Sequence, residues 1–200
     1  MNRSKLNAID IFSGAGGMSI GASMLGIDVV VAIEHDKHAA ATFKANHPDA
    51  KIITDDIRKV TLEDKYKNPF LLFGGPPCQG FSTSNTKTRN KKNENNSLFW
   101  EYIRQVKELN PEWFVFENVE GITSFEKGTV VNKLKKEFKK LGYETEWDVL
   151  IASDYGVPQN RNRFFMVGNR LDVKFVFPEK HEKTVTVEEA IKDLPKLKNG

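Results

Sequence analysis

The 200-residue sequence contains a single cysteine, Cys78. One cysteine excludes a disulfide bond within the chain and any zinc site built from a cysteine cluster. We expect no metal site. The thiol then has two interpretations: a small buried hydrophobic group or a reactive nucleophile.

Long apolar runs are also absent. No stretch of about 18 apolar residues occurs, which argues against a transmembrane helix and a membrane partner. Residues 1–12 hold only a short apolar stretch, interrupted by Asp10, and lack the core of a signal peptide. We therefore expect an intracellular, cytoplasmic protein, associated with the nucleoid if the source is bacterial.

The composition is that of a folded domain. Hydrophobic residues make up 39% of the chain and charged residues 28%, which excludes a disordered protein. The length corresponds to about one domain. The net charge of +3, from 30 basic and 27 acidic residues, is only weak support for a polyanionic partner.

Short β-rich runs alternate with helical stretches along the chain. We expect strands at residues 7–12, 28–34, 51–54, 70–73, 113–117, 144–151 and 163–168. Helices are expected from the glycine-rich residues 13–17 to about residue 25, and at 36–46, 97–109, 129–141 and 187–194, the last opened by a capping box of Thr186 and Glu189. This alternation predicts an α/β fold, a parallel sheet with helices on both faces.

In such sheets ligands bind beyond the carboxyl ends of the strands. The loop after the first strand holds Gly14, Gly16 and Gly17, and Glu34 ends the next strand, twenty positions after Gly14. Glycines let a ligand approach the backbone, and a carboxylate at this place can accept both hydroxyls of a ribose. These residues predict a cofactor that contains a nucleoside, but they do not distinguish a dinucleotide from S-adenosylmethionine. The alternative is a tight turn beside a solvated glutamate.

Cys78 follows two prolines, Pro76 and Pro77, and has glycines on either side. Prolines stiffen the chain, so the thiol is predicted on a rigid loop over the ligand site, where a nucleophile belongs. The alternative is a structural cysteine. The next segment, residues 83–96, is a long polar loop with four basic residues, whereas the lysines of residues 133–140 are expected to form a solvated helix face.

Two further groups are candidates for the chemistry. Glu117 ends the fifth strand, where burial would raise its pKa and suit it to donate a proton; it could equally form a cap or a salt bridge. Arg161 and Arg163 follow Pro158, and we expect them to point in different directions, one to the site and one to a phosphate. A charged turn is the alternative.

At these residues the chain resembles the N-terminal, catalytic portion of the DNA cytosine-5 methyltransferases. Pro-Pro-Cys-Gln followed by Glu-Asn-Val is the most specific part of the resemblance. The matching blocks follow the family's order and cover nearly the whole chain: residues 10–17, 31–36, 56–57, 74–82, 98–102, 116–121 and 159–168.

The resemblance implies a Rossmann-like fold dependent on S-adenosylmethionine, whose product is S-adenosylhomocysteine, with a mostly parallel sheet and an antiparallel strand at the C-terminal edge. Residues 1–180 would form the catalytic domain, and residues 181–200 would begin the connection to a target-recognition region. His35 stands where the family often has a larger aromatic side chain. The implied cofactor-binding residues are Phe12, Gly14, Gly16, Gly17, Met18, Glu34, His35, Asp56, Ile57, Pro76 and Leu98.

The resemblance also implies a mechanism on double-stranded DNA. Cys78 would add to carbon 6 of a flipped-out cytosine, and Glu117 would supply a proton at N3. Arg163 would hold O2, and Arg161 would lie nearer the phosphate. Lys87, Arg89, Lys91 and Lys92 either contact phosphates as the polar loop closes or remain solvated.

Complete enzymes of this family continue into a target-recognition region and further blocks that the chain lacks. We therefore expect a truncated form or one subunit of a split enzyme, completed by a C-terminal segment or second subunit, in a restriction–modification system. The alternatives are a tRNA cytosine methyltransferase, a non-catalytic regulatory relative and a nicotinamide oxidoreductase. Residues 117–123 lack the cysteine typical of the tRNA branch, and both Cys78 and Glu117 are present.

Overall fold

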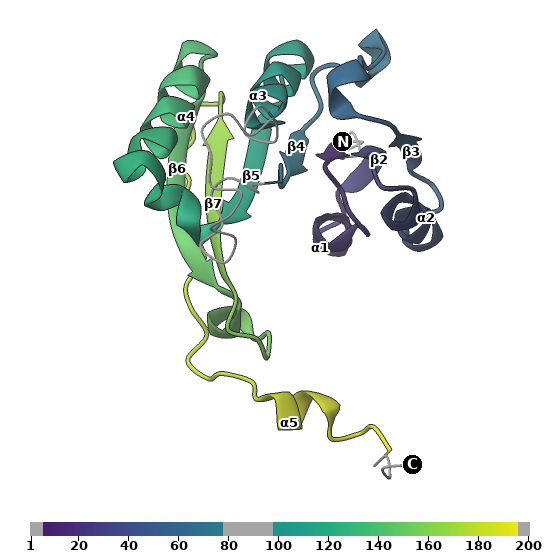
Figure 1. Ribbon diagram of the computed structural model, residues 1–200, viewed down its shortest axis with the longest axis vertical. Helices are drawn as coiled ribbons and strands as arrows, with labels where there is room; N and C mark the ends of the chain where they lie inside the picture. Colours follow the sequence, from purple (N-terminus) through teal and green to yellow (C-terminus); the bar gives the residue numbers. More distant parts are fainter. Residues whose placement is uncertain (1–5, 78–97, 196–200) are drawn as a thin grey trace, which may run out of the picture.

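The computed structural model describes residues 6–77 and 98–195, in which a seven-stranded sheet lies between helices (Figure 1). The strand order is β3-β2-β1-β4-β5-β7-β6. The strands are β1 (Asn7–Ile11), β2 (Asp28–Glu34), β3 (Lys51–Thr54), β4 (Leu71–Gly74), β5 (Trp113–Val119), β6 (Glu144–Ile151) and β7 (Asn162–Asn169). The helices are α1 (Gly17–Met24), α2 (Lys37–Asn46), α3 (Leu98–Leu109), α4 (Thr129–Lys140) and α5 (Val187–Ile191).

Strands β3, β2, β1, β4 and β5 are parallel to one another. Strand β7 is antiparallel to β5, and β6 in turn is antiparallel to β7. The mostly parallel sheet is thus confirmed, with the antiparallel strand one place in from the C-terminal edge. The chain leaves β1 towards β2 and β3 and returns to β4 on the other side of β1. This reversal puts the crevice of the fold beyond the carboxyl ends of β1 and β4.

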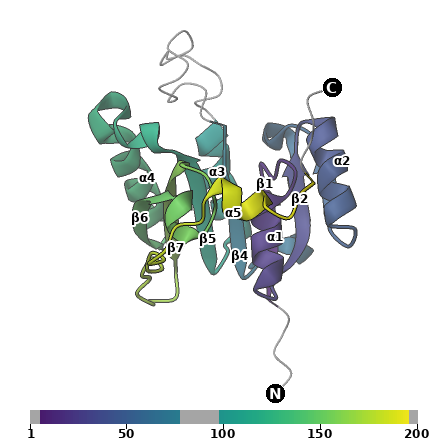
Figure 2. The same cartoon turned by 90° about the horizontal axis from the view of Figure 1, so that it is seen from below.

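Helices cover both faces of the sheet, α3 and α4 on one and α1 and α2 on the other (Figures 1 and 2). Alternation along β1 explains the two layers. Ile9 and Ile11 pack into the large cluster that includes α3 and α4, whereas Ala8 packs with Ala22 of α1. The small side chain of Ala8 lets α1 lie close to the strand.

Aromatic side chains fix α3 against β5. The ring of Tyr102 lies 5.0 Å from that of Phe116 at an interplanar angle of 84°, an edge-to-face contact. The Tyr102 hydroxyl donates a hydrogen bond of 2.8 Å to the carbonyl of Val115. Because α3 begins at Leu98 and β5 carries Glu117, this contact sets two walls of the crevice relative to each other.

The expected elements differ from the observed ones mainly at their ends. The first strand stops at Ile11 because Phe12 has a left-handed backbone, with φ of 62°. The fifth strand continues to Val119, paired with β7, so that Glu117 lies within it. The last helix ends at Ile191, and its capping box of Thr186 and Glu189 is confirmed. The polar loop predicted at residues 83–96 lies outside the described residues.

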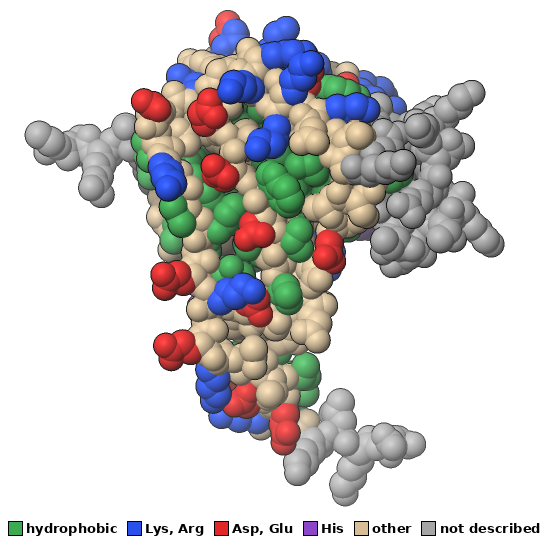
Figure 3. Space-filling model, turned by 90° about the vertical axis from the view of Figure 1, so that its left-hand side faces the viewer, with side chains coloured by type: hydrophobic (Ala, Val, Ile, Leu, Met, Phe, Trp, Pro, Cys, Tyr) green, Lys and Arg blue, Asp and Glu red, His purple; other side chains and the backbone are tan. Residues whose placement is uncertain are grey.

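The lysines of α4 point to solvent, as expected for the outer face of an amphipathic helix. On the face that contains α4 and β6, Lys and Arg side chains gather towards the end where α3 and α4 lie, and acidic and apolar side chains mix further down (Figure 3). Over the described ranges, no helix has the length and apolar character needed to cross a bilayer. Those same residues contain no group of three or more His, Cys, Asp or Glu arranged to hold a metal ion.

Asp10 is a carboxyl group buried below the glycine-rich loop. It lies on β1 with 1% of its surface exposed, and the Ser19 hydroxyl of α1 donates a hydrogen bond of 2.6 Å to it. Burial, opposed by this hydrogen bond and reinforced by the charge of Glu34, raises the pKa of Asp10 to about 8. The pair therefore joins the strand before the loop to the helix after it in a protonation-dependent contact.

Replacing Asp10 with asparagine tests this contact. The pKa of Asp10 rises from its ordinary value of 3.8 to about 8 on folding, so between these pH values the native state binds a proton that the unfolded state does not. The contribution of Asp10 to the free energy of unfolding therefore falls as the pH rises from 3.8 to about 8, by up to about 1.4 kcal/mol per pH unit. Asp10→Asn removes the titration and keeps an acceptor for Ser19. We expect the free energy of unfolding of the variant, measured in urea, to rise relative to that of the wild type between about pH 5 and pH 8. If the difference between the two proteins did not change with pH, this account would be contradicted.

Candidate active site

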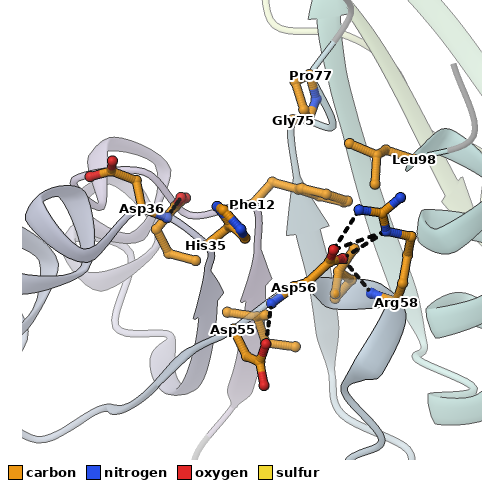
Figure 4. A pocket seen from close by; sticks show the side chains of 12 residues that line it. Phe12, His35, Asp36, Asp55, Asp56, Arg58, Gly75, Pro77 and Leu98 are labelled. Carbon is orange, nitrogen blue, oxygen red and sulfur yellow. Dashed lines mark hydrogen bonds and ion pairs between the residues drawn. The ribbon is translucent and has the colours of Figure 1, made fainter. Parts of the chain in front are cut away.

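Two adjoining cavities lie beyond the carboxyl ends of β1 and β4, and Phe12 and Gly75 line both. The first has a volume of about 400 Å³ and is lined by Phe12, Ile33, Glu34, His35, Asp36, Asp55, Asp56, Ile57, Arg58, Gly75, Pro77 and Leu98 (Figure 4). The second, of about 620 Å³, is lined by Phe12, Ser13, Gly17, Met18, Gly75, Glu117, Leu150, Ala152, Tyr155, Arg161, Arg163, Phe165 and Pro178.

The glycine-rich loop turns sharply between β1 and α1. Phe12, Gly14 and Gly16 have φ angles of 62°, 54° and 93°, a left-handed conformation that glycine adopts without strain. At Gly16 a Cβ would also collide with the rings of His47 and Phe43. Gly16 is therefore required for the back of the loop, and it lines neither cavity.

Glu34 lines the first cavity, and two backbone N–H groups hold its carboxylate. Its Oε2 accepts a hydrogen bond of 2.8 Å from Gly14 N, and its Oε1 accepts one of 2.7 Å from Asp36 N. Gly14 lines neither cavity itself, but its N–H orients this carboxylate. The predicted spacing of twenty residues thus brings the glycine loop and the acid together.

The adenine-side wall predicted at Asp56 and Ile57 belongs to a short 3₁₀ turn, η1 (Ile57–Lys59). The Asp56 carboxylate caps this turn by accepting from the Arg58 backbone N–H and also pairs with the Arg58 guanidinium (Figure 4). The hydrogen bonds from Arg58 lower the pKa of Asp56 to about 2. Phe12 reaches across the same cavity, with His35 on one side and Leu98 on the other (Figure 4).

The second cavity holds a carboxylate and a guanidinium in contact. Arg163 on β7 approaches Glu117 on β5 with 2.9 Å between Nε and Oε1, and their side chains are 24% and 23% exposed. Burial raises the pKa of Glu117, and the charges of Arg163 and Arg161 oppose that rise. A Cβ on Gly75 would meet the Glu117 carboxylate, so a larger residue there would displace that side chain.

The expectation that the side chains of Arg161 and Arg163 point in different directions was wrong. Both line the second cavity, since residues two apart in an extended segment share a face. Pro76 is buried, and its carbonyl accepts a hydrogen bond from Asn118, while Pro77 lines the first cavity in its place. Cys78 and the basic residues Lys87, Arg89, Lys91 and Lys92 lie outside the described residues.

Several cavity residues were not predicted from the sequence. Ser13 has a hydroxyl that is shielded from solvent and has no hydrogen-bond partner within the described parts of the chain. Ser13 lies between Phe12 and Gly14, in the loop after the first strand. That position was the sequence signal that could have identified it as a cavity residue. Tyr155 and Pro178 form another wall, where the Tyr155 hydroxyl donates to the Pro178 carbonyl at 3.2 Å.

The sequence matches the C-5 cytosine-specific DNA methylases over residues 6–199. The chain belongs to this family. It is 38% identical to the Type II methyltransferase M.DdeI of Desulfomicrobium norvegicum, over 98% of this chain and 50% of that protein. It is 40% identical to the Type II methyltransferase M.AquIA of Picosynechococcus sp., over 86% of this chain and 75% of that protein.

Solved structures agree with the family assignment. A prophage-encoded protein of E. coli, described as a DNA modification methyltransferase, superposes with a TM-score of 0.81 at 35% identity, over 96% of this chain and 56% of that one. The S. pombe Dnmt2 methyltransferase, at 20% identity and a TM-score of 0.67 over 94% of this chain and 54% of that one, shares the fold. The predicted Rossmann-like methyltransferase fold is confirmed. The chain spans about half the length of M.DdeI and of M1.HphI of Haemophilus parahaemolyticus.

Membership of this family implies S-adenosylmethionine as the cofactor. The residues present fit such a molecule. The first cavity combines apolar walls with the oriented carboxylates of Glu34 and Asp56, as a nucleoside requires. The unpartnered Ser13 hydroxyl lies in the loop beside the second cavity and suits a polar amino-acid end.

Proposed function

We propose that this chain is the catalytic part of a DNA cytosine-5 methyltransferase of a restriction–modification system. The observation that carries the proposal is the Glu117–Arg163 pair, placed in a cavity that adjoins the nucleoside-like cavity across Phe12 and Gly75. An acid with a raised pKa thus lies next to a place suited to a methyl donor.

S-adenosylmethionine, when bound, supplies a methyl group on a sulfonium. Glu34 would hold the ribose hydroxyls, and Asp56 and Ile57 would contact the adenine. Gly17, Met18 and the Ser13 hydroxyl would meet the amino-acid end, which the second cavity admits. Phe12 and Gly75, common to both cavities, would lie where the two ends of the cofactor join.

The cytosine would enter the second cavity after leaving the duplex, because stacked neighbours block attack from above the ring. The Cys78 thiolate would form a bond to carbon 6, which makes carbon 5 electron-rich enough to accept the methyl group. The charge that develops on N3 would be met by a proton held by Glu117, and Arg163 would bind O2. Arg161 would lie nearer the backbone phosphate. Loss of the carbon-5 proton then lets the carbon–sulfur bond break.

Transfer of labelled methyl groups tests the function. The complete protein would be incubated with tritiated S-adenosylmethionine and either unmethylated duplex DNA or tRNA, and the nucleosides separated. We expect label in 5-methyldeoxycytidine only. Label confined to tRNA would favour the tRNA branch of the superfamily, and failure to bind S-adenosylhomocysteine while binding NAD would overturn the proposal.

We further propose that residues 1–180 form the catalytic domain and that residues 181–200 lead to a target-recognition region. In support, the last ion pair and hydrogen bond with the body among the described residues are the Lys180–Asp154 pair at 2.7 Å and the bond from His181 N to the Asp154 carbonyl at 2.8 Å. Beyond them α5 projects away from the sheet (Figure 1). Alone, the chain is expected to methylate DNA weakly or not at all.

An exposed apolar face on α1 supports a completing segment or subunit. Ile20, Met24 and Leu25 are 46%, 82% and 79% exposed, and Gly17 and Gly21 on the same helix are exposed as well. Glycines allow the backbone of a second helix to approach closely. We propose that a helix of the completing segment packs against this face.

The substitution Met24→Glu tests whether this face of α1 is a docking surface or an ordinary solvent-exposed surface. In the isolated chain the substitution is expected to change the free energy of unfolding by no more than about 0.5 kcal/mol, because the side chain is in solvent. In the completed protein it should cost about 2 kcal/mol or more, since a charge would be buried at the contact. Val176→Glu, at another exposed apolar residue, is the control. Equal effects of Met24→Glu in the two forms would refute the docking face.

A further inference from the structure

Arg104 of α3 donates hydrogen bonds to a segment far from it in the sequence. From the middle of the helix its Nη2 donates to the carbonyl oxygen of Ile57 at 2.8 Å and to that of Val60 at 3.3 Å. The neighbouring Gln105 also donates to the Val60 carbonyl, at 3.2 Å. Two consecutive residues of α3 therefore hold the backbone of η1 and its C-cap residue, more than forty positions earlier in the chain.

Two glutamates fix the orientation of this guanidinium. Arg104 Nε lies 2.7 Å from Glu101 Oε2, and its Nη1 lies 2.9 Å from Glu108 Oε2. All three guanidinium nitrogens thus have partners, and the planar group cannot rotate without losing one of them. A lysine has a single nitrogen and cannot reproduce the arrangement.

The segment that Arg104 holds is the wall of the first cavity. Asp56 and Arg58 line that cavity (Figure 4), as does Ile57. The carbonyl at 2.8 Å from Arg104 belongs to Ile57 itself. Arg104 does not line it. Its effect on anything bound there would pass through the backbone of η1.

A 3₁₀ turn this short has little stability of its own. Within η1 the backbone bonds are those from Lys59 N to the Asp56 carbonyl at 2.8 Å and from Val60 N to the Ile57 carbonyl at 3.2 Å. Without Arg104, the turn would keep these two bonds, the Asp56 cap on Arg58 N and the hydrogen bond from Gln105, and would lose both bonds from the guanidinium. A cavity wall that must be ordered on binding lowers affinity.

We propose that Arg104 is a positioning residue for the adenine end of the cofactor site. It sets cofactor affinity by fixing η1 from α3 and takes no part in the chemical step. The proposal rests on the function proposed above, because it assumes that the first cavity receives adenine. It adds a residue outside the cavity that controls how well the cavity is formed.

The test compares Arg104→Met with the wild type in the complete protein. Methionine keeps the apolar stem and removes the donors. We expect the Kd for S-adenosylhomocysteine and the KM for S-adenosylmethionine to rise about tenfold, with kcat at saturating cofactor changed less than about twofold. The Kd for 5′-methylthioadenosine, which lacks the amino-acid end, should rise by the same factor, whereas Ser13→Ala should weaken S-adenosylhomocysteine alone.

Arg170→Met is the matched control. Arg170 also donates to a backbone carbonyl, that of Pro111 at 3.0 Å, but at the amino end of β5 and far from the cavities. It should leave KM unchanged. Arg104→Lys, which keeps the charge near the glutamates, should give an intermediate KM and serves as the test if the methionine variant does not fold.

The outcomes are distinct. An unchanged Kd in the Arg104 variants, or equal losses of affinity in the Arg104 and Arg170 variants, would overturn the positioning role. A fall in kcat matching the rise in KM would also overturn it. A wild-type protein that does not bind S-adenosylhomocysteine would instead overturn the proposed function.

Discussion

Replacing Glu117 with glutamine is expected to slow methyl transfer by about 10² to 10⁴-fold, the usual contribution of a positioned acid. The amide has the same shape, and Arg163 can still donate to its oxygen, so the cavity should remain intact. What is lost is the proton that would meet the charge on N3. Binding of S-adenosylhomocysteine should change by less than about twofold, because Glu117 is proposed to meet the cytosine, whereas other residues are proposed to hold the cofactor.

The pH dependence adds a second readout. Burial raises the pKa of Glu117, against the opposing charges of Arg163 and Arg161, so the acid form persists above its ordinary range of 4.5. An enzyme that needs this proton should lose kcat as pH rises through the raised pKa, and Glu117→Gln should lack that limb. Rapid-quench measurement of single turnovers at several pH values would show both effects.

Glu120→Gln provides the matched control for this prediction. Glu120 follows β5 at the next turn, is exposed, and accepts a hydrogen bond of 3.0 Å from Asn162. It lines neither cavity, so its variant should keep the wild-type rate. If Glu117→Gln also kept more than about a tenth of that rate, Glu117 would be an ion-pair residue without a role as an acid.

The sequence predicted the elements of the sheet well because each depends on local periodicity. Strands and helices were placed within a few residues, and errors came where the backbone does something local patterns do not encode. Phe12 ends β1 early by taking a left-handed conformation, which a bulky residue adopts only under the demands of the surrounding loop. The antiparallel strand was implied by the family resemblance and not by the pattern.

The parts of the site that depend on residues close together in the sequence were predicted better than the parts that depend on distant ones. Glu34 could be placed from its spacing to Gly14, because one β-α-β unit fixes both. Which of Pro76 and Pro77 lines the cavity could not be predicted, because Pro76 is held by a hydrogen bond from Asn118, 42 positions later in the chain. The error at Arg161 and Arg163 was of another kind, because the same-face rule for extended residues was available from the sequence.

Contacts over long distances in the chain had no sequence signal. Arg104 reaches the carbonyl of Ile57 only because α3 packs beside η1, and nothing in its own segment distinguishes it from other helix arginines paired with glutamates. The Tyr155–Pro178 contact depends in the same way on the return of the chain after β7. Residues that support a site from behind are therefore the part that requires a structure.

Replacing Cys78 with serine is expected to reduce turnover of the completed enzyme by about 10⁴-fold or more, as removal of a nucleophile does. A thiolate is accessible near neutral pH, whereas a hydroxyl remains protonated and adds poorly to carbon 6. Affinity for S-adenosylhomocysteine should change little, because the sulfur is proposed to react with the base. A parallel loss of affinity and turnover would identify Cys78 as a structural residue.

Trapping the covalent intermediate tests the same sulfur directly. With 5-fluorocytosine in the DNA, methyl transfer leaves a fluorine where a proton must depart, so the carbon–sulfur bond cannot break and the protein stays attached. Wild-type protein supplied with S-adenosylmethionine should form a complex that survives denaturing electrophoresis, and Cys78→Ser should form none. Glu117→Gln should form it slowly, since its defect precedes elimination, while Glu120→Gln should match the wild type. If the wild type formed no adduct although it methylated ordinary DNA, methyl transfer would have to proceed without a bond from this cysteine.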